Sequence, residues 1–288
     1  MDNAITALVT PFDDKENVNL DSLRNVIEFN EKRGISSFWV LGTTGEFNML
    51  SQQEKISVVR AAREFTKGKI YAGVNENSLS NSYVLLKEYV NIGVDAVFSV
   101  PPIYHKPGKK GLIDYYEALS KPGIPVYVYN IPSYVGYSID LETLEKLVSE
   151  GIISGMKYTT SDLDSLITYT LKLKEVDKNF KVFIGSDTLI LPALMYGGDG
   201  AVSGIANFAP EIISNIFSKY NEGNYKEALK YQLMAVKLNE AIKLSDYPSG
   251  IKIALRYRGL FVGRTRAPLE ENITAESAIY NVLKELNL

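Results

Sequence analysis

Residues 126–157, VYVYNIPSYVGYSIDLETLEKLVSEGIISGMK, contain one full unit of the pattern that decides the fold. The unit begins with a short β-branched and aromatic run at residues 126–130 and ends with a second strand-like run at residues 154–157. Between them lies an amphipathic stretch at residues 141–150, and Asp140 precedes it as a helix-capping residue. A strand, a helix and a second strand in this order are typical of a parallel sheet.

The same alternation occurs eight times along the chain. The expected strands are residues 4–10, 37–41, 70–74, 96–100, 126–130, 154–157, 182–185 and 201–204. The expected helices are residues 20–33, 52–65, 80–91, 110–119, 141–150, 163–176, 188–196 and 209–220. Eight such units favour a closed (β/α)8 barrel, the TIM barrel, over an open doubly wound sheet.

After Gly223 the pattern changes to helices alone, at residues 225–244, 250–257 and 274–286. No stretch rich in proline, glycine or serine separates this part from the rest. We therefore expect a barrel that holds the active site at residues 1–222. Residues 223–288 are expected to form a C-terminal helical extension packed on that barrel.

The composition narrows the class of protein. A hydrophobic share of 45% and a charged share of 23% are those of a globular protein, and the net charge of -3 predicts neither a nucleic-acid nor a membrane partner. The chain has no cysteine, which excludes disulfides and thiolate metal sites. No long apolar run occurs, so we expect a cytoplasmic protein. Motifs of the types GxGxxG, GxxxxGK[ST], HExxH and GxSxG are absent, so we expect no cofactor and no metal.

In a barrel of this kind the loops after the strands build the active site. Lys157 ends the sixth expected strand and Tyr129 lies at the end of the fifth. Low-dielectric walls favour the neutral amine, which attacks a ketone and then, as a protonated imine, withdraws electrons from the neighbouring carbon–carbon bond. The Tyr129 phenol is placed to move the proton. Taken singly, Lys157 could be an ion-paired or solvated strand-end lysine, and Tyr129 is one of 19 tyrosines.

Other polar groups follow other strands. Thr43 and Thr44 lie between two glycines, where their hydroxyls and the nearby backbone N–H groups suit a carboxylate, although a tight turn with threonine caps explains the spacing equally well. Gly185 and Asp187 could hold sugar hydroxyls, or Asp187 could cap the next helix. His105 is the only histidine, and we expect it to be solvated.

Three motifs, in order, carry a resemblance to a known family: GTTGE at residues 42–46, YNIP at 129–132 and GMK at 155–157. With the run ITALVTPF at residues 5–12, the chain resembles the dihydrodipicolinate synthase and N-acetylneuraminate lyase family of pyruvate-dependent class I aldolases over the whole barrel. The resemblance implies a small keto-acid substrate and a Schiff-base mechanism.

The same resemblance assigns roles to individual residues. It implies that Lys157 is the Schiff-base lysine and that Tyr129 is the phenol that transfers the proton. It also implies that Thr43 and Thr44 bind the substrate carboxylate. Tyr104 matches the family tyrosine that reaches the site of a neighbouring subunit. The resemblance therefore implies a homo-oligomer, usually a homotetramer.

Family members differ in what they join to pyruvate or split from it. The dihydrodipicolinate synthase pattern has an arginine in the loop after YNxP, where this chain has Tyr134, which argues against that reaction. The turn at residues 185–187 and the uncharged wall at 203–207 look most like archaeal 2-keto-3-deoxygluconate aldolases. In that reading Gly185, Asp187 and Gly204 face the distal hydroxyls and Tyr134 closes the site. The stretch after Tyr104 has lysines but no arginine, which favours the unphosphorylated substrate.

The sequence thus predicts an aldolase that cleaves 2-keto-3-deoxygluconate to pyruvate and glyceraldehyde, with 2-keto-3-deoxygalactonate as a second candidate substrate. Alternatives within the family are N-acetylneuraminate lyase and dihydrodipicolinate synthase. An alternative of another class is a barrel that binds a keto acid without turning it over.

Overall fold

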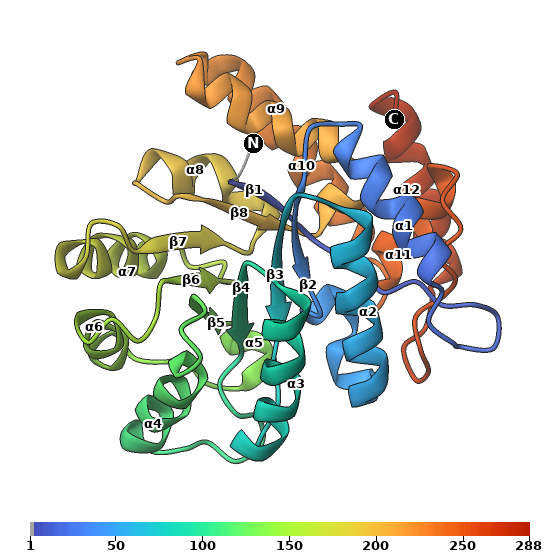
Figure 1. Cartoon of the computed structure of the whole chain (residues 1–288). Helices are drawn as coiled ribbons and strands as arrows, with labels where there is room; N and C mark the ends of the chain where they lie inside the picture. The colour runs from blue at the N-terminus through green and yellow to red at the C-terminus, as the bar shows by residue number, and fades with distance from the viewer. Residues whose placement is uncertain (1–2) are drawn as a thin grey trace.

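The computed structural model describes residues 3–288, and its centre is a closed barrel of eight parallel strands. The strands follow one another around the barrel in chain order, and β8 pairs with β1 to close it (Figure 1). They are β1 (Ala4–Ala7), β2 (Ser37–Val40), β3 (Lys69–Gly73), β4 (Ala96–Ser99), β5 (Val126–Asn130), β6 (Gly155–Tyr158), β7 (Lys181–Ile184) and β8 (Gly200–Ser203). All eight strands expected from the sequence are confirmed, with small shifts at their ends.

Helices surround the barrel, as the alternating pattern predicts (Figure 1). The helices along the barrel part are α1 (Leu20–Glu31), α2 (Gln52–Phe65), α3 (Leu79–Ile92), α4 (Lys109–Ser120), α5 (Pro132–Val135), α6 (Leu141–Ser149), α7 (Leu163–Val176), α8 (Ile190–Met195) and α9 (Pro210–Asn221). The (β/α)8 architecture expected from the sequence is therefore present.

Local signals in the sequence set several helix ends. Ser51 and Glu54 form a reciprocal capping box at the start of α2, where each side chain accepts a hydrogen bond from the other residue's backbone N–H. Asp140 caps α6 by accepting from the Thr143 backbone N–H at 2.8 Å. Gly93 ends α3 in the left-handed region, with φ of 79°.

Aromatic side chains fill much of the barrel interior. Trp39 of β2 stacks on Phe98 of β4 with ring centres 3.8 Å apart, and Tyr127 of β5 stacks on Phe183 of β7 at 5.8 Å. Both stacks are buried in the core. The interior is therefore a packed core, and space for a ligand remains at the end of the barrel where the strands lead into their loops.

The shortest elements were not predicted from the sequence, and they lie in the segments that follow strands. Turns of 3₁₀ helix occupy Thr43–Gly45, Phe47–Met49, Asp187–Leu189 and Ile205–Asn207, and α5 follows β5. The helix expected at residues 188–196 begins later, at Ile190, because residues 187–189 form one of these turns. Elements this short have no hydrophobic periodicity by which to detect them.

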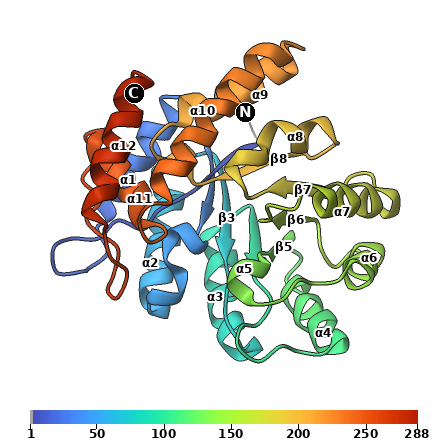
Figure 2. The same cartoon turned by 180° about the vertical axis from the view of Figure 1, so that it is seen from behind.

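The C-terminal part consists of α10 (Tyr225–Ile242), α11 (Ser249–Tyr257) and α12 (Ile273–Glu285), gathered at one side of the barrel (Figures 1 and 2). Helix α10 packs on α9 and on α12, and its buried side chains belong to the same hydrophobic core as the barrel. We propose that the boundary near residue 222 divides a barrel from an extension, and not two independently folding units.

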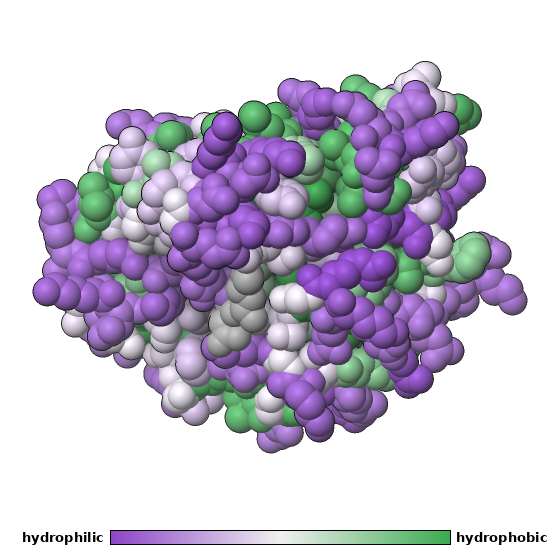
Figure 3. Space-filling view, turned by 90° about the horizontal axis from the view of Figure 1, so that it is seen from above, coloured by the Kyte–Doolittle hydropathy of each residue, from purple (hydrophilic) through white to green (hydrophobic). Residues whose placement is uncertain are grey.

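The molecular surface is mixed. The face shown in Figure 3 is mostly hydrophilic, with hydrophobic residues in small groups between charged ones. No helix within residues 3–288 is long and apolar enough to cross a membrane.

Candidate active site

Lys157 and Tyr129 lie side by side at the mouth of the barrel. They are register partners on β6 and β5, and the Lys157 Nζ atom lies 4.1 Å from the centre of the Tyr129 ring. The same nitrogen lies 5.6 Å from the Trp39 ring. The Lys157 side chain is only 3% exposed, and it forms no ion pair with any carboxylate of residues 3–288. The Lys157 nitrogen is therefore buried against aromatic rings and has no ion-pair partner among the described residues.

Gly185 leaves room for the Lys157 side chain. A Cβ atom at Gly185 would lie 2.8 Å from Lys157 Cε and 1.9 Å from Thr159 Oγ1. Real side chains do not approach so closely, so any larger residue would displace the lysine or the threonine. Gly185 therefore acts through the space it leaves, in addition to any contact with a ligand.

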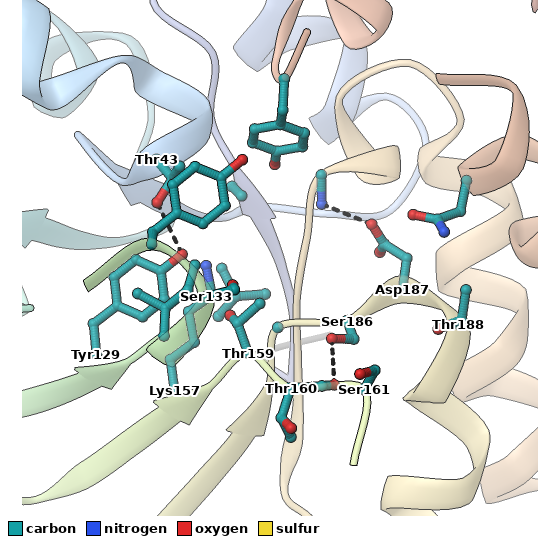
Figure 4. Close-up of a pocket in the computed structure, with 18 of the residues that line it drawn as sticks. Thr43, Tyr129, Ser133, Lys157, Thr159, Thr160, Ser161, Ser186, Asp187 and Thr188 are labelled. Atoms are coloured by element: carbon teal, nitrogen blue, oxygen red, sulfur yellow. Dashed lines mark hydrogen bonds between the residues drawn. The ribbon is translucent and has the colours of Figure 1, made fainter. Parts of the chain in front are cut away.

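The two threonines after β2 contact two different tyrosines. The Thr43 hydroxyl is hydrogen-bonded to the Tyr129 hydroxyl at 3.1 Å (Figure 4). The Thr44 hydroxyl is hydrogen-bonded to the Tyr247 hydroxyl at 2.6 Å. Burial raises the pKa of Tyr247 well above its ordinary value, so its phenol stays protonated. Thr43 and Tyr129 both line the cavity described below, whereas Thr44 is buried behind it.

Asp187 is a buried carboxyl group bound to backbone N–H groups. Its Oδ2 atom accepts from Gly204 at 3.1 Å and from Ile205 at 3.2 Å, while Oδ1 has no protein partner (Figure 4). Burial raises the pKa of Asp187, although Ser203 and these N–H groups stabilise the charged form. The alternative that Asp187 caps the next helix is wrong, because its side chain bonds to the start of the turn after β8.

A cavity of about 510 Å³ joins these groups, a volume suited to a small metabolite. Tyr134 lines it with a side chain that is 57% exposed, and this ring faces the Tyr247 ring with centres 6.5 Å apart. Figure 4 shows hydroxyl groups around the space. The polar lining residues are Thr43, Tyr129, Ser133, Tyr134, Lys157, Thr159, Thr160, Ser161, Ser186, Asp187, Thr188, Asn239, Lys243 and Tyr247, together with the glycines Gly185 and Gly204.

Tyr104 does not line the cavity of its own chain. It is 91% exposed and adopts a left-handed backbone conformation with φ of 71°. The loop that carries it is held by the Asn77 side chain, which accepts from the Ile103 backbone N–H at 2.7 Å, and by the Tyr137 hydroxyl, which donates to the Pro102 carbonyl at 2.8 Å. The neighbouring His105 is exposed, as expected from the sequence.

Several residues that line the cavity were not predicted from the sequence. Thr159 follows Lys157 by two positions, so the twofold alternation of a strand places both on one face and could have indicated it. Asn239 and Lys243 of the α10 region, and Tyr247, come from the C-terminal extension, which the sequence suggested was packing alone. No local signal connects these residues with the barrel mouth.

Comparison with known proteins agrees with this picture. The family model described as the dihydrodipicolinate synthetase family matches residues 1–285. The 4-hydroxy-tetrahydrodipicolinate synthase of Bacillus subtilis is 33% identical over 287 residues, which cover 96% of this chain and 98% of that protein.

Solved structures show the same fold. A prophage protein of the dihydrodipicolinic acid synthase family from E. coli K12, solved in complex with pyruvate, superposes with a TM-score of 0.95 at 24% identity, covering 100% of this chain and 99% of that one. A variant of the Sulfolobus solfataricus 2-keto-3-deoxygluconate aldolase superposes with a TM-score of 0.90 at 27% identity, covering 99% of this chain and 96% of that one.

The closed barrel and these similarities define an enzyme of the aldolase type. The chain belongs to the dihydrodipicolinate synthetase family.

Proposed function

We propose that the protein is a Schiff-base class I aldolase that cleaves 2-keto-3-deoxygluconate to pyruvate and glyceraldehyde. The observation that carries the proposal is the buried Lys157 amine beside Tyr129, which is itself hydrogen-bonded to Thr43. The roles assigned to the residues combine their contacts at the cavity with the resemblance to class I aldolases.

Lys157 attacks the C2 carbonyl of the keto acid, and loss of water gives a protonated imine. The Thr43–Thr44 segment binds the C1 carboxylate and fixes which face of the ketone meets the amine. Tyr129, in contact with the Thr43 hydroxyl, takes the proton of the C4 hydroxyl as the C3–C4 bond breaks. Glyceraldehyde leaves, and protonation and hydrolysis of the remaining enamine release pyruvate.

The distal end of the cavity supports a hydroxylated substrate. Asp187 and Thr159 line the cavity, each with a buried side-chain oxygen that has no protein partner, and Gly204 lines it beside the Asp187 carboxyl group. The only cations that line the cavity, among the residues described, are Lys157 and Lys243. Hydroxyl and amide groups of this kind suit a polyhydroxylated aldehyde fragment, with Tyr134 closing the opening.

A second candidate is the condensation of pyruvate with an aldehyde that carries an anionic group. Two observations favour it: the relatives cited above include a 4-hydroxy-tetrahydrodipicolinate synthase, and Lys243 lines the cavity rim. A single flexible ammonium makes a weaker carboxylate site than the two-pronged guanidinium of an arginine, and residues 131–136 contain no arginine. We therefore rank this reaction, and cleavage of a 6-phosphorylated substrate, second.

An assay on a small panel of substrates tests the proposal. We expect pyruvate release from 2-keto-3-deoxygluconate and 2-keto-3-deoxygalactonate at rates well above those from N-acetylneuraminate and the 6-phosphate. Faster condensation of pyruvate with aspartate semialdehyde than with glyceraldehyde would establish the synthase reaction instead. Turnover of no substrate, with binding of pyruvate retained, would establish a non-catalytic keto-acid-binding barrel.

The exposed position of Tyr104 favours a homo-oligomeric enzyme. A tyrosine that is 91% exposed, on a loop fixed by Asn77 and Tyr137, is arranged to enter another copy of the chain. We propose a homotetramer in which Tyr104 reaches the neighbouring cavity. Size-exclusion chromatography with light scattering measures the assembly, and a monomeric active enzyme would contradict it.

A further inference from the structure

The loop that carries Thr43 and Thr44 has an unfavourable backbone. Leu41 and Glu46, which flank it, both adopt left-handed conformations, with φ of 63° and 54°. Residues other than glycine enter this region at a cost and stay there only when their surroundings hold them. Contacts that hold the loop therefore decide where the two threonine hydroxyls point.

On the barrel side, two ordinary hydrogen bonds hold the loop. The Thr10 hydroxyl donates to the Gly45 carbonyl at 2.7 Å, and the Asn75 side chain donates to the Leu41 carbonyl at 2.7 Å. These bonds come from the segments that follow β1 and β3, the strands on either side of β2. They restrain the backbone but touch neither threonine side chain.

On the other side, the loop is held by a buried ion pair. The Glu46 carboxylate lies 2.7 Å from the Lys252 ammonium of α11, and both side chains are at most 1% exposed. The second Glu46 oxygen accepts from the Arg266 backbone N–H at 2.9 Å, and Lys252 also donates to the Arg264 carbonyl at 3.0 Å. The Phe12 ring lies 4.1 Å from the Lys252 nitrogen.

The same C-terminal segment holds the threonines directly. Tyr247, five positions before Lys252 in the chain, bonds to the Thr44 hydroxyl at 2.6 Å. The start of α11 packs closely on the end of α10, because a Cβ atom at Gly250 would lie 2.2 Å from the Ile242 carbonyl oxygen. One rigid piece of the extension thus contacts the loop at Thr44 and at Glu46.

Stability alone is a poor reason for such a pair. The free energy lost when two charges are removed from water offsets much of their electrostatic attraction. Apolar residues of similar shape therefore often give the same stability as a buried ion pair. Burial lowers the pKa of Lys252 to about 8. Glu46 and Glu271 oppose this shift, because their negative charges stabilise the charged form of Lys252. What the pair supplies, and an apolar contact would not, is a directed link between α11 and the loop.

We propose that the Glu46–Lys252 ion pair and the Tyr247 phenol are positioning groups that set the Thr43–Thr44 loop for binding the substrate carboxylate. The inference rests on the proposed Schiff-base function and adds to it a role for the C-terminal extension. None of the three groups needs to touch the reacting carbon atoms.

Trapping of the imine with borohydride tests this, with pyruvate and acetone as paired probes. Both are ketones, but only pyruvate has the carboxylate that the loop would bind. In the double variant Glu46→Gln/Lys252→Met no charge is left unpaired, so it is the variant most suited to fold. We expect its half-saturating pyruvate concentration to rise on the order of ten-fold, as for loss of one charged hydrogen bond, with the maximal yield and the acetone yield unchanged.

A matched control comes from the far end of α11. Arg258 forms an ion pair with Glu211 of α9 at 2.6 Å and does not contact the loop. Arg258→Met should lower the melting temperature yet leave the pyruvate titration at its wild-type position. A second positioning variant, Tyr247→Phe, should weaken pyruvate trapping in the same direction as the double variant.

The possible results distinguish a failure of the positioning role from a failure of the proposed Schiff-base function. Overlapping pyruvate curves for the wild type and the folded double variant overturn the inference, and so does an equal loss of pyruvate and acetone adducts. An equal effect of Arg258→Met also overturns it, because that result would indicate general loosening. Absence of any adduct in the wild type would instead overturn the proposed Schiff-base function.

Discussion

The Lys157 Nζ atom lies 4.1 Å from the centre of the Tyr129 ring, across the register of β5 and β6. This relationship follows from the parallel barrel, because neighbouring strands end at the same rim and bring their last side chains together. The Tyr129 hydroxyl points onward to Thr43. Amine, phenol and threonine therefore form one connected group at the cavity floor.

Tyr129→Phe separates imine formation from bond cleavage. Without the hydroxyl, Lys157 still meets the ketone, but no phenol accepts the C4 proton. We expect borohydride trapping of pyruvate to persist while cleavage of 2-keto-3-deoxygluconate slows by about 100-fold or more. Single-turnover kinetics measure both steps. Unchanged cleavage would mean that another group moves the proton.

Gly185→Ala tests the space beside the lysine. The added Cβ atom would meet Thr159 Oγ1 at 1.9 Å and Lys157 Cε at 2.8 Å, so the lysine must move. A displacement of this kind predicts a loss of kcat of about 100-fold. Gly108→Ala is the matched control, because nothing lies within 4 Å of a Cβ atom there. Equal activity of the two variants would contradict the role given to Gly185.

Asp187→Asn tests recognition of the distal hydroxyls. Asparagine retains an oxygen for the Gly204 and Ile205 N–H groups but is a weaker acceptor for a sugar hydroxyl. We expect KM for 2-keto-3-deoxygluconate to rise on the order of ten-fold, with pyruvate trapping unchanged. If both change together, Asp187 acts on the lysine and not on the distal end of the substrate.

The pH dependence of stability gives an independent check on Asp187. Burial raises its pKa in the folded state, so its stabilising contribution is complete below the unfolded value of 3.8 and is lost as pH rises through the folded pKa. Asparagine cannot ionise, and the variant should therefore gain stability relative to the wild type as pH rises. Denaturant unfolding across this pH range measures the difference, and parallel curves would contradict the assignment.

The contribution of Glu54 to stability depends on pH in the opposite direction. Hydrogen bonds from Arg266, with smaller ones from Ser51, lower the pKa of Glu54 from 4.5 to about 2. Its stabilisation is present above pH 4.5 and is lost as pH falls through about 2. We expect Glu54→Gln to cost about 1 kcal/mol at neutral pH, because the pair is partly exposed, and to flatten the unfolding free energy between these pH values. A wild-type slope in the variant would contradict this account.

Repetition and capping made the barrel predictable from the sequence. The strand runs recur between amphipathic stretches, and residues such as Ser51 and Asp140 mark helix starts. Lys157 and Tyr129 were predictable as neighbours because both end consecutive strands. These features depend on local pattern, which a single sequence shows directly.

The rest of the site depends on contacts that are distant in the chain. Nothing near Tyr247 indicates that its hydroxyl meets Thr44, and nothing near Lys252 indicates a carboxylate partner in the loop after β2. The direction of the Asp187 carboxylate, toward the turn after β8, was equally hidden. Tertiary packing alone decides these pairings.

The most direct measurement is peptide mapping of the protein after borohydride reduction in the presence of pyruvate. The account predicts a stable adduct on Lys157 and on no other lysine, with no adduct and no turnover in Lys157→Ala although that variant remains folded. An adduct on a different lysine, or cleavage by Lys157→Ala at the wild-type rate, would contradict it.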